Sequence, residues 1–168
     1  MSRIHSRAAI AALVAAVTLI PAVAGCGQVA EKAAEMAAEQ AIGGDIDVND
    51  NSVTVTDDEG NEVTAGEDIT LPDTWPSQVP PYEAGTLSLV TAQADGSAFA
   101  SWLTDATPEE AAMSYGAVLE DAGYTIETES NMGGMFVREY TGNGYTVSFN
   151  TIASDGQTTV MVTAAPGS

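Results

Sequence analysis

YTIETESNMGGMFVREYTGNGYTVSFNTIASDGQTTVMVTA, residues Tyr124–Ala164, carries the clearest pattern in the chain. Apolar and polar residues alternate in four segments, which is the period of a strand with one buried face. Gly-Gly, Asn-Gly and Asp-Gly separate the segments, and these pairs favour the tight turns of hairpins. We therefore predict four antiparallel strands, at Tyr124–Glu129, Met135–Tyr140, Tyr145–Ile152 and Thr158–Ala164.

A helix is predicted directly before these strands. Thr107-Pro-Glu-Glu110 combines a threonine N-cap, a proline at the first helical position and a capping-box glutamate. The helix is expected to run to Ala122, with Gly123 at its left-handed C-terminal position. Gly116 lies in mid-helix, where glycine costs about 1 kcal/mol against alanine. This glycine predicts a close contact with a strand.

Two further strands are predicted before the helix. Leu87 and Leu89 alternate with polar residues in the first, residues 94–97 form a turn, and Phe99–Leu103 forms the second. The order is ββαββββ, which predicts a two-layer α+β domain over residues 69–168, with one helix packed on an antiparallel sheet. The opposite sheet face is rich in Ser and Thr and is expected to face solvent.

A proline-rich segment, Leu71–Gly85, precedes the first of these strands. Prolines at 72, 76, 80 and 81 disfavour a helix or a central strand. Trp75, Val79 and Tyr82 are interspersed among them. A proline-aromatic segment can be a recognition element, but we expect a strap whose aromatic side chains cover one end of the core.

Residues 45–68 are rich in acidic and turn-forming residues. Asp45, Asp47 and Asn49 are weak candidate metal ligands, because D-x-D-x-N opens a calcium-binding loop. The remaining pattern requires glycine and glutamate where this chain has Asp50 and Thr56. A β-hairpin with its turn near residues 57–61 accounts for this segment more simply.

The N-terminus has the three parts of a secretory signal peptide. Arg3 and Arg7 precede an apolar core at Ala8–Ile20, and small residues lead to Cys26. This core is shorter than the roughly 20 residues of a spanning helix. Residues 1–25 are therefore predicted to be the signal peptide. Residues 26–44 would then hold Cys26 and an Ala/Glu-rich helical spacer.

Composition excludes several classes of function. The only histidine is His5, in the predicted signal peptide, and Cys26 is the only cysteine, so Ser-His and Cys-His catalysis and His or Cys zinc sites are excluded from the mature chain. Lys32 and Arg138 are the only mature cations against 24 acidic residues, which leaves a charge of about −22. Such a surface repels nucleic acid. We expect no cofactor and no enzymatic activity.

Val23-Ala24-Gly25-Cys26 resembles the lipobox of bacterial lipoproteins. The resemblance implies that Cys26 carries diacylglycerol, becomes the first residue after cleavage and is then usually N-acylated. With the Ala/Glu helix, the acidic hairpin and the proline strap, the layout is similar to that of small actinobacterial lipoproteins. That similarity implies a lipid anchor on the outer face of the cytoplasmic membrane.

Three functions stay open at this stage. The first is a non-enzymatic lipoprotein that binds another cell-envelope component, such as a protein. The second is a carrier or sensor of a small apolar ligand or lipid, and the third is a carboxylate-based hydrolase. Met132-Gly-Gly-Met135 is a candidate recognition tip. Arg138 is expected to neutralise a carboxylate from another strand, because its neighbour Glu139 points to the opposite face.

Overall fold

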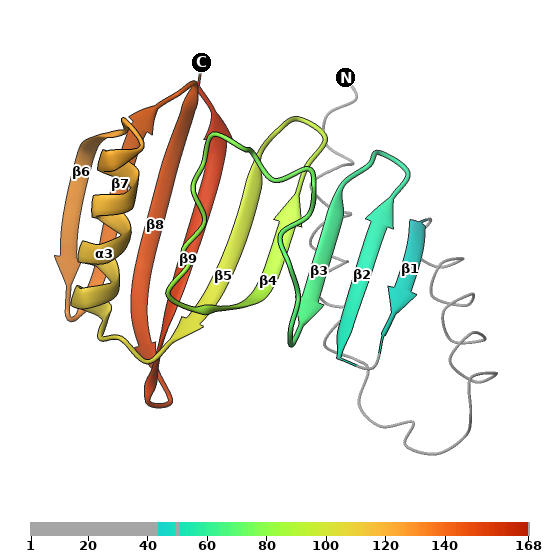
Figure 1. Ribbon diagram of the computed structural model, residues 1–168, viewed down its shortest axis with the longest axis horizontal. Coiled ribbons are helices and arrows are strands. Elements are labelled where there is room, and N and C mark those ends of the chain that lie inside the picture. The colour runs from blue at the N-terminus through green and yellow to red at the C-terminus, as the bar shows by residue number, and fades with distance from the viewer. Residues whose placement is uncertain (1–43, 50, 168) are drawn as a thin grey trace.

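The computed structural model describes residues 44–49 and 51–167, which form one open antiparallel sheet of nine strands with a single helix (Figure 1). The helix is α3 (Pro108–Asp121). Across the sheet the order is β1-β2-β3-β4-β5-β9-β8-β7-β6. The strands are β1 (Gly44–Val48), β2 (Ser52–Asp57), β3 (Glu62–Gly66), β4 (Thr86–Ala92), β5 (Ala98–Thr104), β6 (Thr125–Met132), β7 (Met135–Gly142), β8 (Tyr145–Ser154) and β9 (Gln157–Pro166).

The predicted order ββαββββ is confirmed from β4 to β9. The expected hairpin is also present, as β2 and β3, and β3 pairs directly with β4. β1 was not predicted, because Gly44, Asp45 and Asp47 disfavour a strand. The predicted signal peptide, Cys26 and the helical spacer lie outside the described residues.

Two segments cover the same face of the sheet. α3 packs on β6 to β9, and the connection between β3 and β4, which contains the predicted proline-rich strap Leu71–Gly85, crosses the sheet beside it (Figure 1). The hydroxyl of Tyr115 on α3 donates to the carbonyl of Pro80 at 2.9 Å, and that of Tyr124 donates to Gln78 at 3.1 Å. The predicted role of the strap is confirmed, since Trp75, Val79 and Tyr82 belong to the core.

The capping residues of α3 and its mid-helix glycine have the roles that the sequence predicted. The Thr107–Glu110 capping box is complete, with each residue's side chain accepting from the other's backbone N–H. Gly116 faces β7 closely: a methyl group there would lie 2.7 Å from both Arg138 Nη1 and the Tyr140 hydroxyl. This is closer than van der Waals contact, so the contact that Gly116 predicted is confirmed.

The face of the sheet that carries the apolar side chains is not the same in β2 and β3 as in β4. Thr54, Thr64 and Val90 are register partners and share the face that carries α3. Because side chains alternate, the valines of β2 and β3 point to the opposite face. The predicted alternation in β4 was wrong, because a register shift between Leu87 and Leu89 lets Leu87 enter the core and leaves Leu89 outside it.

Candidate functional site

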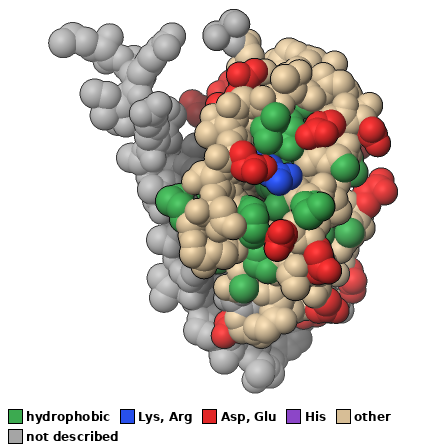
Figure 2. Space-filling model, turned by 90° about the vertical axis from the view of Figure 1, so that its left-hand side faces the viewer, with side chains coloured by type: hydrophobic (Ala, Val, Ile, Leu, Met, Phe, Trp, Pro, Cys, Tyr) green, Lys and Arg blue, Asp and Glu red, His purple; other side chains and the backbone are tan. Residues whose placement is uncertain are grey.

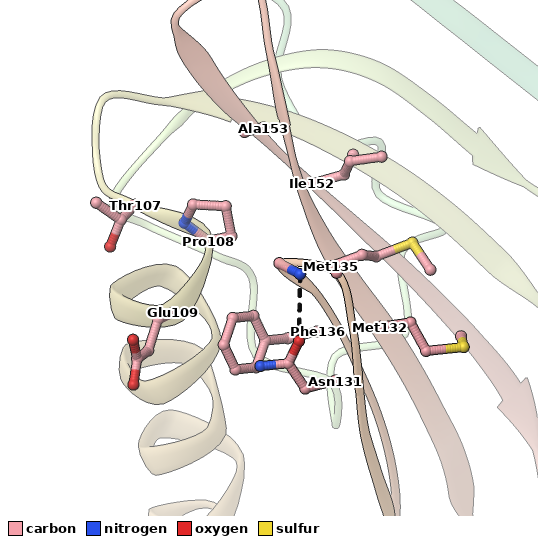
Figure 3. A pocket seen from close by; sticks show the side chains of 11 residues that line it. Thr107, Pro108, Glu109, Asn131, Met132, Met135, Phe136, Ile152 and Ala153 are labelled. Atoms are coloured by element: carbon pink, nitrogen blue, oxygen red, sulfur yellow. Dashed lines mark hydrogen bonds between the residues drawn. The ribbon is translucent and has the colours of Figure 1, made fainter.

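An open groove of about 880 Å³ lies where α3 begins and the β6–β7 hairpin ends (Figure 3). Three segments line it: the start of α3, the tip of the hairpin and the last part of β8. Most of the lining side chains are apolar. We call it the methionine groove, and its lining residues are Thr107, Pro108, Glu109, Asn131, Met132, Gly133, Gly134, Met135, Phe136, Ile152 and Ala153.

The hairpin tip is built by a two-residue glycine turn. Gly133 and Gly134 have φ angles of 65° and 93°, which suit a turn with both central residues in the left-handed region. Asn131 Oδ1 accepts a hydrogen bond from the Gly134 N–H at 3.3 Å (Figure 3). The turn makes Met132 and Met135 cross-strand partners, and their side chains lie on the same side of the hairpin as Ile152 (Figure 3).

The wall of the groove that faces α3 is held by contacts with buried residues. Phe136 pairs with Thr151 across β7 and β8, and its ring points toward α3 (Figure 3). Thr151 is fully buried, and its hydroxyl donates to the carbonyl of Pro108 at 2.8 Å. This bond ties the first residue of α3 to β8, and so holds the helix start against the strands that carry the groove.

The charges near the groove are negative. Glu109 lines it, while Glu127 and Glu129 are exposed on β6. Arg138 is the only Lys or Arg among the described residues, and it appears as the single basic side chain in Figure 2. Its Nε lies 2.6 Å from Glu129 Oε2, and Nη1 donates to the carbonyl of Ala112 at 2.9 Å. The prediction that Arg138 meets a carboxylate from another strand is confirmed.

A second carboxylate, that of Glu110, follows Glu109 at the start of α3 and does not line the groove. Hydrogen bonds from the Thr107 backbone, and then from its hydroxyl, lower the pKa of Glu110 below its ordinary value. Glu110 therefore stays ionised at neutral pH and caps α3. This carboxylate serves the helix start, and the groove surface is neutral except for Glu109.

The weak metal candidates lie far along the sheet order from the groove. Asp45 and Asp47 are exposed on β1, and Asn49 follows that strand. An extended strand spreads its side chains, whereas a calcium loop wraps them round the ion. Among the described residues no three His, Cys, Asp or Glu side chains converge on a metal position. Cation binding at Asp45, Asp47 and Asn49 stays a prediction, and Cys26 lies outside the described residues.

A second cleft, of about 240 Å³, lies between the strap and α3. Tyr82, Ser114 and Tyr115 line it. The buried Tyr82 hydroxyl has no hydrogen-bond partner in the described structure, and burial raises the pKa of Tyr115. The volume is below the several hundred Å³ that a drug-sized ligand occupies. We therefore take the methionine groove as the candidate site.

Sequence reasoning identified the hairpin tip but did not place it beside the start of α3. The signal was present: α3 ends at Asp121 and β6 begins at Thr125, and the short connection through Gly123 makes the two elements run in opposite directions. Fourteen helical residues span about 21 Å and eight strand residues about 26 Å. The far ends therefore meet, which places the hairpin tip next to Pro108 and Glu109, with the Phe136 ring facing α3 and the methionine side chains on the opposite side with Ile152 (Figure 3).

Comparison with protein-family models, with curated proteins and with solved structures found no significant match. Within the described residues no helix is long and apolar enough to span a membrane.

Proposed function

We propose that this chain is an extracytoplasmic lipoprotein, anchored through Cys26, that binds another component of the cell envelope at the methionine groove. The lipobox at residues 23–26 supports the anchor. A chain with at least two acyl groups is held stably at a membrane. The spacer at residues 26–44 would place the sheet domain away from the lipid surface, in reach of a partner.

The observation that carries the proposal is an exposed apolar surface at the hairpin tip, next to a helix start that the Thr151–Pro108 hydrogen bond ties to β8. Met132 is 59% exposed and Ile152 is 39% exposed, and both line the groove. Methionine is flexible and polarisable, so it adapts to differently shaped apolar partners. Contiguous apolar surface on a folded domain commonly marks a binding site. The proposed role is binding, without covalent chemistry.

A small apolar ligand or lipid is the second candidate. The groove volume, about 880 Å³, falls within the range of small-molecule sites. The groove is open to solvent, however, whereas carriers bury most of the ligand surface. A protein partner can supply the missing cover, and this favours the first candidate.

Cross-linking in cells tests the proposal. The lipidated chain is captured after photo-cross-linking, and the attached proteins are identified by mass spectrometry. We expect Met132→Ser combined with Met135→Ser to remove the cross-linked partner. Met113→Ser is the matched control, because Met113 is 60% exposed on α3 and does not line the groove. Equal partner yield from the double variant and wild type would refute the proposed site.

The anchor has its own test. We expect Cys26→Ala to abolish incorporation of a labelled fatty acid and to leave unprocessed precursor. Cleavage and membrane retention without labelling would contradict the lipoprotein assignment.

A further inference from the structure

The strand next to the groove has an open edge. β6 is the terminal strand of the sheet on the α3 side (Figure 1), and within residues 44–49 and 51–167 it pairs only with β7. Every residue of β6 except Ser130 is exposed. An exposed edge strand presents backbone N–H and C=O groups that an extended segment of another chain can pair with.

The hairpin register identifies which backbone groups are available. In a hairpin with a two-residue turn, the residues flanking the turn exchange hydrogen bonds with each other, and outward-facing residues alternate with them. Met132 and Met135 flank the turn. The backbone groups of Asn131 and Glu129 therefore point away from β7. Asn131 also lines the methionine groove, so the free edge continues into it.

Charge selects the kind of segment that fits. Glu127 and Glu129 are exposed on β6, and Glu109 lines the groove. The one cation nearby, Arg138, already contacts Glu129 and the Ala112 carbonyl. The surface therefore has unbalanced negative charge beside apolar side chains. A complementary segment carries Lys or Arg together with an apolar residue.

We propose that the partner is an extended cationic segment that pairs with Thr128–Met132 as a tenth strand. This proposal rests on the proposed binding function of the methionine groove. The backbone hydrogen bonds hold the segment, one apolar side chain lies beside Met132 and Met135, and the basic side chains point to the opposite side, which carries Glu109 and Glu129. Side-chain alternation along a strand allows both kinds of contact at once.

Two features argue against a second copy of this chain as the added strand. The chain carries a formal net charge of −20, and two β6 strands would place like charges next to each other, which is destabilising. The register shift between Ile126 and Thr128 also interrupts the edge. The paired length is therefore limited to about five residues, which suits a short peptide segment better than a long symmetric strand pair.

The test uses the full chain in detergent and a fluorescent ten-residue peptide that alternates lysine with valine and leucine. Binding is measured by anisotropy, and protection of residues 125–132 by hydrogen exchange and mass spectrometry. We expect saturable binding with increased protection of β6. A peptide methylated at alternate backbone nitrogens should bind at least about tenfold more weakly, because it cannot donate those hydrogen bonds.

Charge variants provide the second arm. We expect Glu109→Lys combined with Glu127→Lys to weaken binding about fivefold or more. Glu59→Lys combined with Glu67→Lys makes the same change in net charge at exposed positions in the β2–β3 part of the sheet, and we expect a smaller effect. Equal weakening by both pairs would show attraction by net charge alone and would overturn the proposal.

The outcomes separate this proposal from the proposed function. Equal affinity of the methylated and unmethylated peptides would overturn strand addition. Loss of the cellular cross-link in the methionine double variant would then still support a binding groove. Peptide binding by β6 together with an unchanged cross-link would overturn the groove as the cellular site, while strand addition to β6 would stand.

Discussion

The hydroxyl of Thr151 offers a sharp test of how the methionine groove is held. Thr151→Val keeps the shape of the side chain and removes the hydrogen bond to the Pro108 carbonyl, which is 2.8 Å long in a fully buried position. A hydrogen bond of this kind contributes about 1 kcal/mol, within a range of roughly 0.5–1.5 kcal/mol. The Pro108 carbonyl lies in the first turn of α3, where a backbone N–H one turn later can still donate a hydrogen bond to it. We therefore expect the loss of unfolding free energy to stay within this range.

Urea unfolding provides the assay. Trp75 and Trp102 are both buried and lie with their ring centroids 6.1 Å apart, so their fluorescence reports on loss of the core. With a urea dependence of about 1–3 kcal/mol per molar, a loss of 1 kcal/mol lowers the midpoint by about 0.3–1 M. Thr163→Val on β9 is the control, because Thr163 is exposed and the change should stay within about 0.5 kcal/mol.

The variant also reports on the groove itself. Loosening the start of α3 should weaken binding of the cationic peptide as well as the fold, since Pro108 and Glu109 line the groove. A Thr151→Val protein that unfolds at the same urea concentration as Thr163→Val would refute the reasoning. It would mean that packing, and not this hydrogen bond, positions the helix start.

Two further predictions concern the groove's turn and cap. We expect Gly134→Ala to destabilise the fold by roughly 1–2 kcal/mol in urea unfolding, because its φ of 93° is strained for a residue with a Cβ. Gly133→Asn should cost less, since asparagine tolerates the left-handed φ of 65°; equal costs would contradict this. We also expect Glu110→Ala to destabilise at pH 7 but much less at pH 3. The Thr107 hydrogen bonds lower the pKa of Glu110, so ionised Glu110 stabilises the fold above the unfolded carboxyl pKa, and this is lost as pH falls through the folded pKa. A pH-independent difference would show that the charge plays no part.

The elements that could be predicted from the sequence are those whose capping and turn residues favour the same conformation that packing favours. The capping box at Thr107 and Glu110, and the turns at Gly133 and Gly144, each specify a backbone conformation independently of the rest of the chain. Gly116 indicated a close strand because a helix interior disfavours glycine. β1 gave no such signal, since its strand exists through pairing with β2 and not through the propensities of its residues.

The groove illustrates what periodicity alone does not reveal. Alternation predicted that Arg138 and its neighbour Glu139 would point to opposite faces, and in β7 Arg138 points toward α3, as the ring of Phe136 does. It did not indicate that the β6–β7 tip would lie beside the start of the helix, because that depends on relative lengths and on the antiparallel course of α3 and β6. Once those lengths are compared, an apolar tip with glycines at both turn positions must meet a helix N-terminus carrying glutamates. The groove and the open edge of β6 follow from the order of the elements, and the glutamates at positions 109, 127 and 129 add the negative charge. Together these features define the cationic extended partner that we propose.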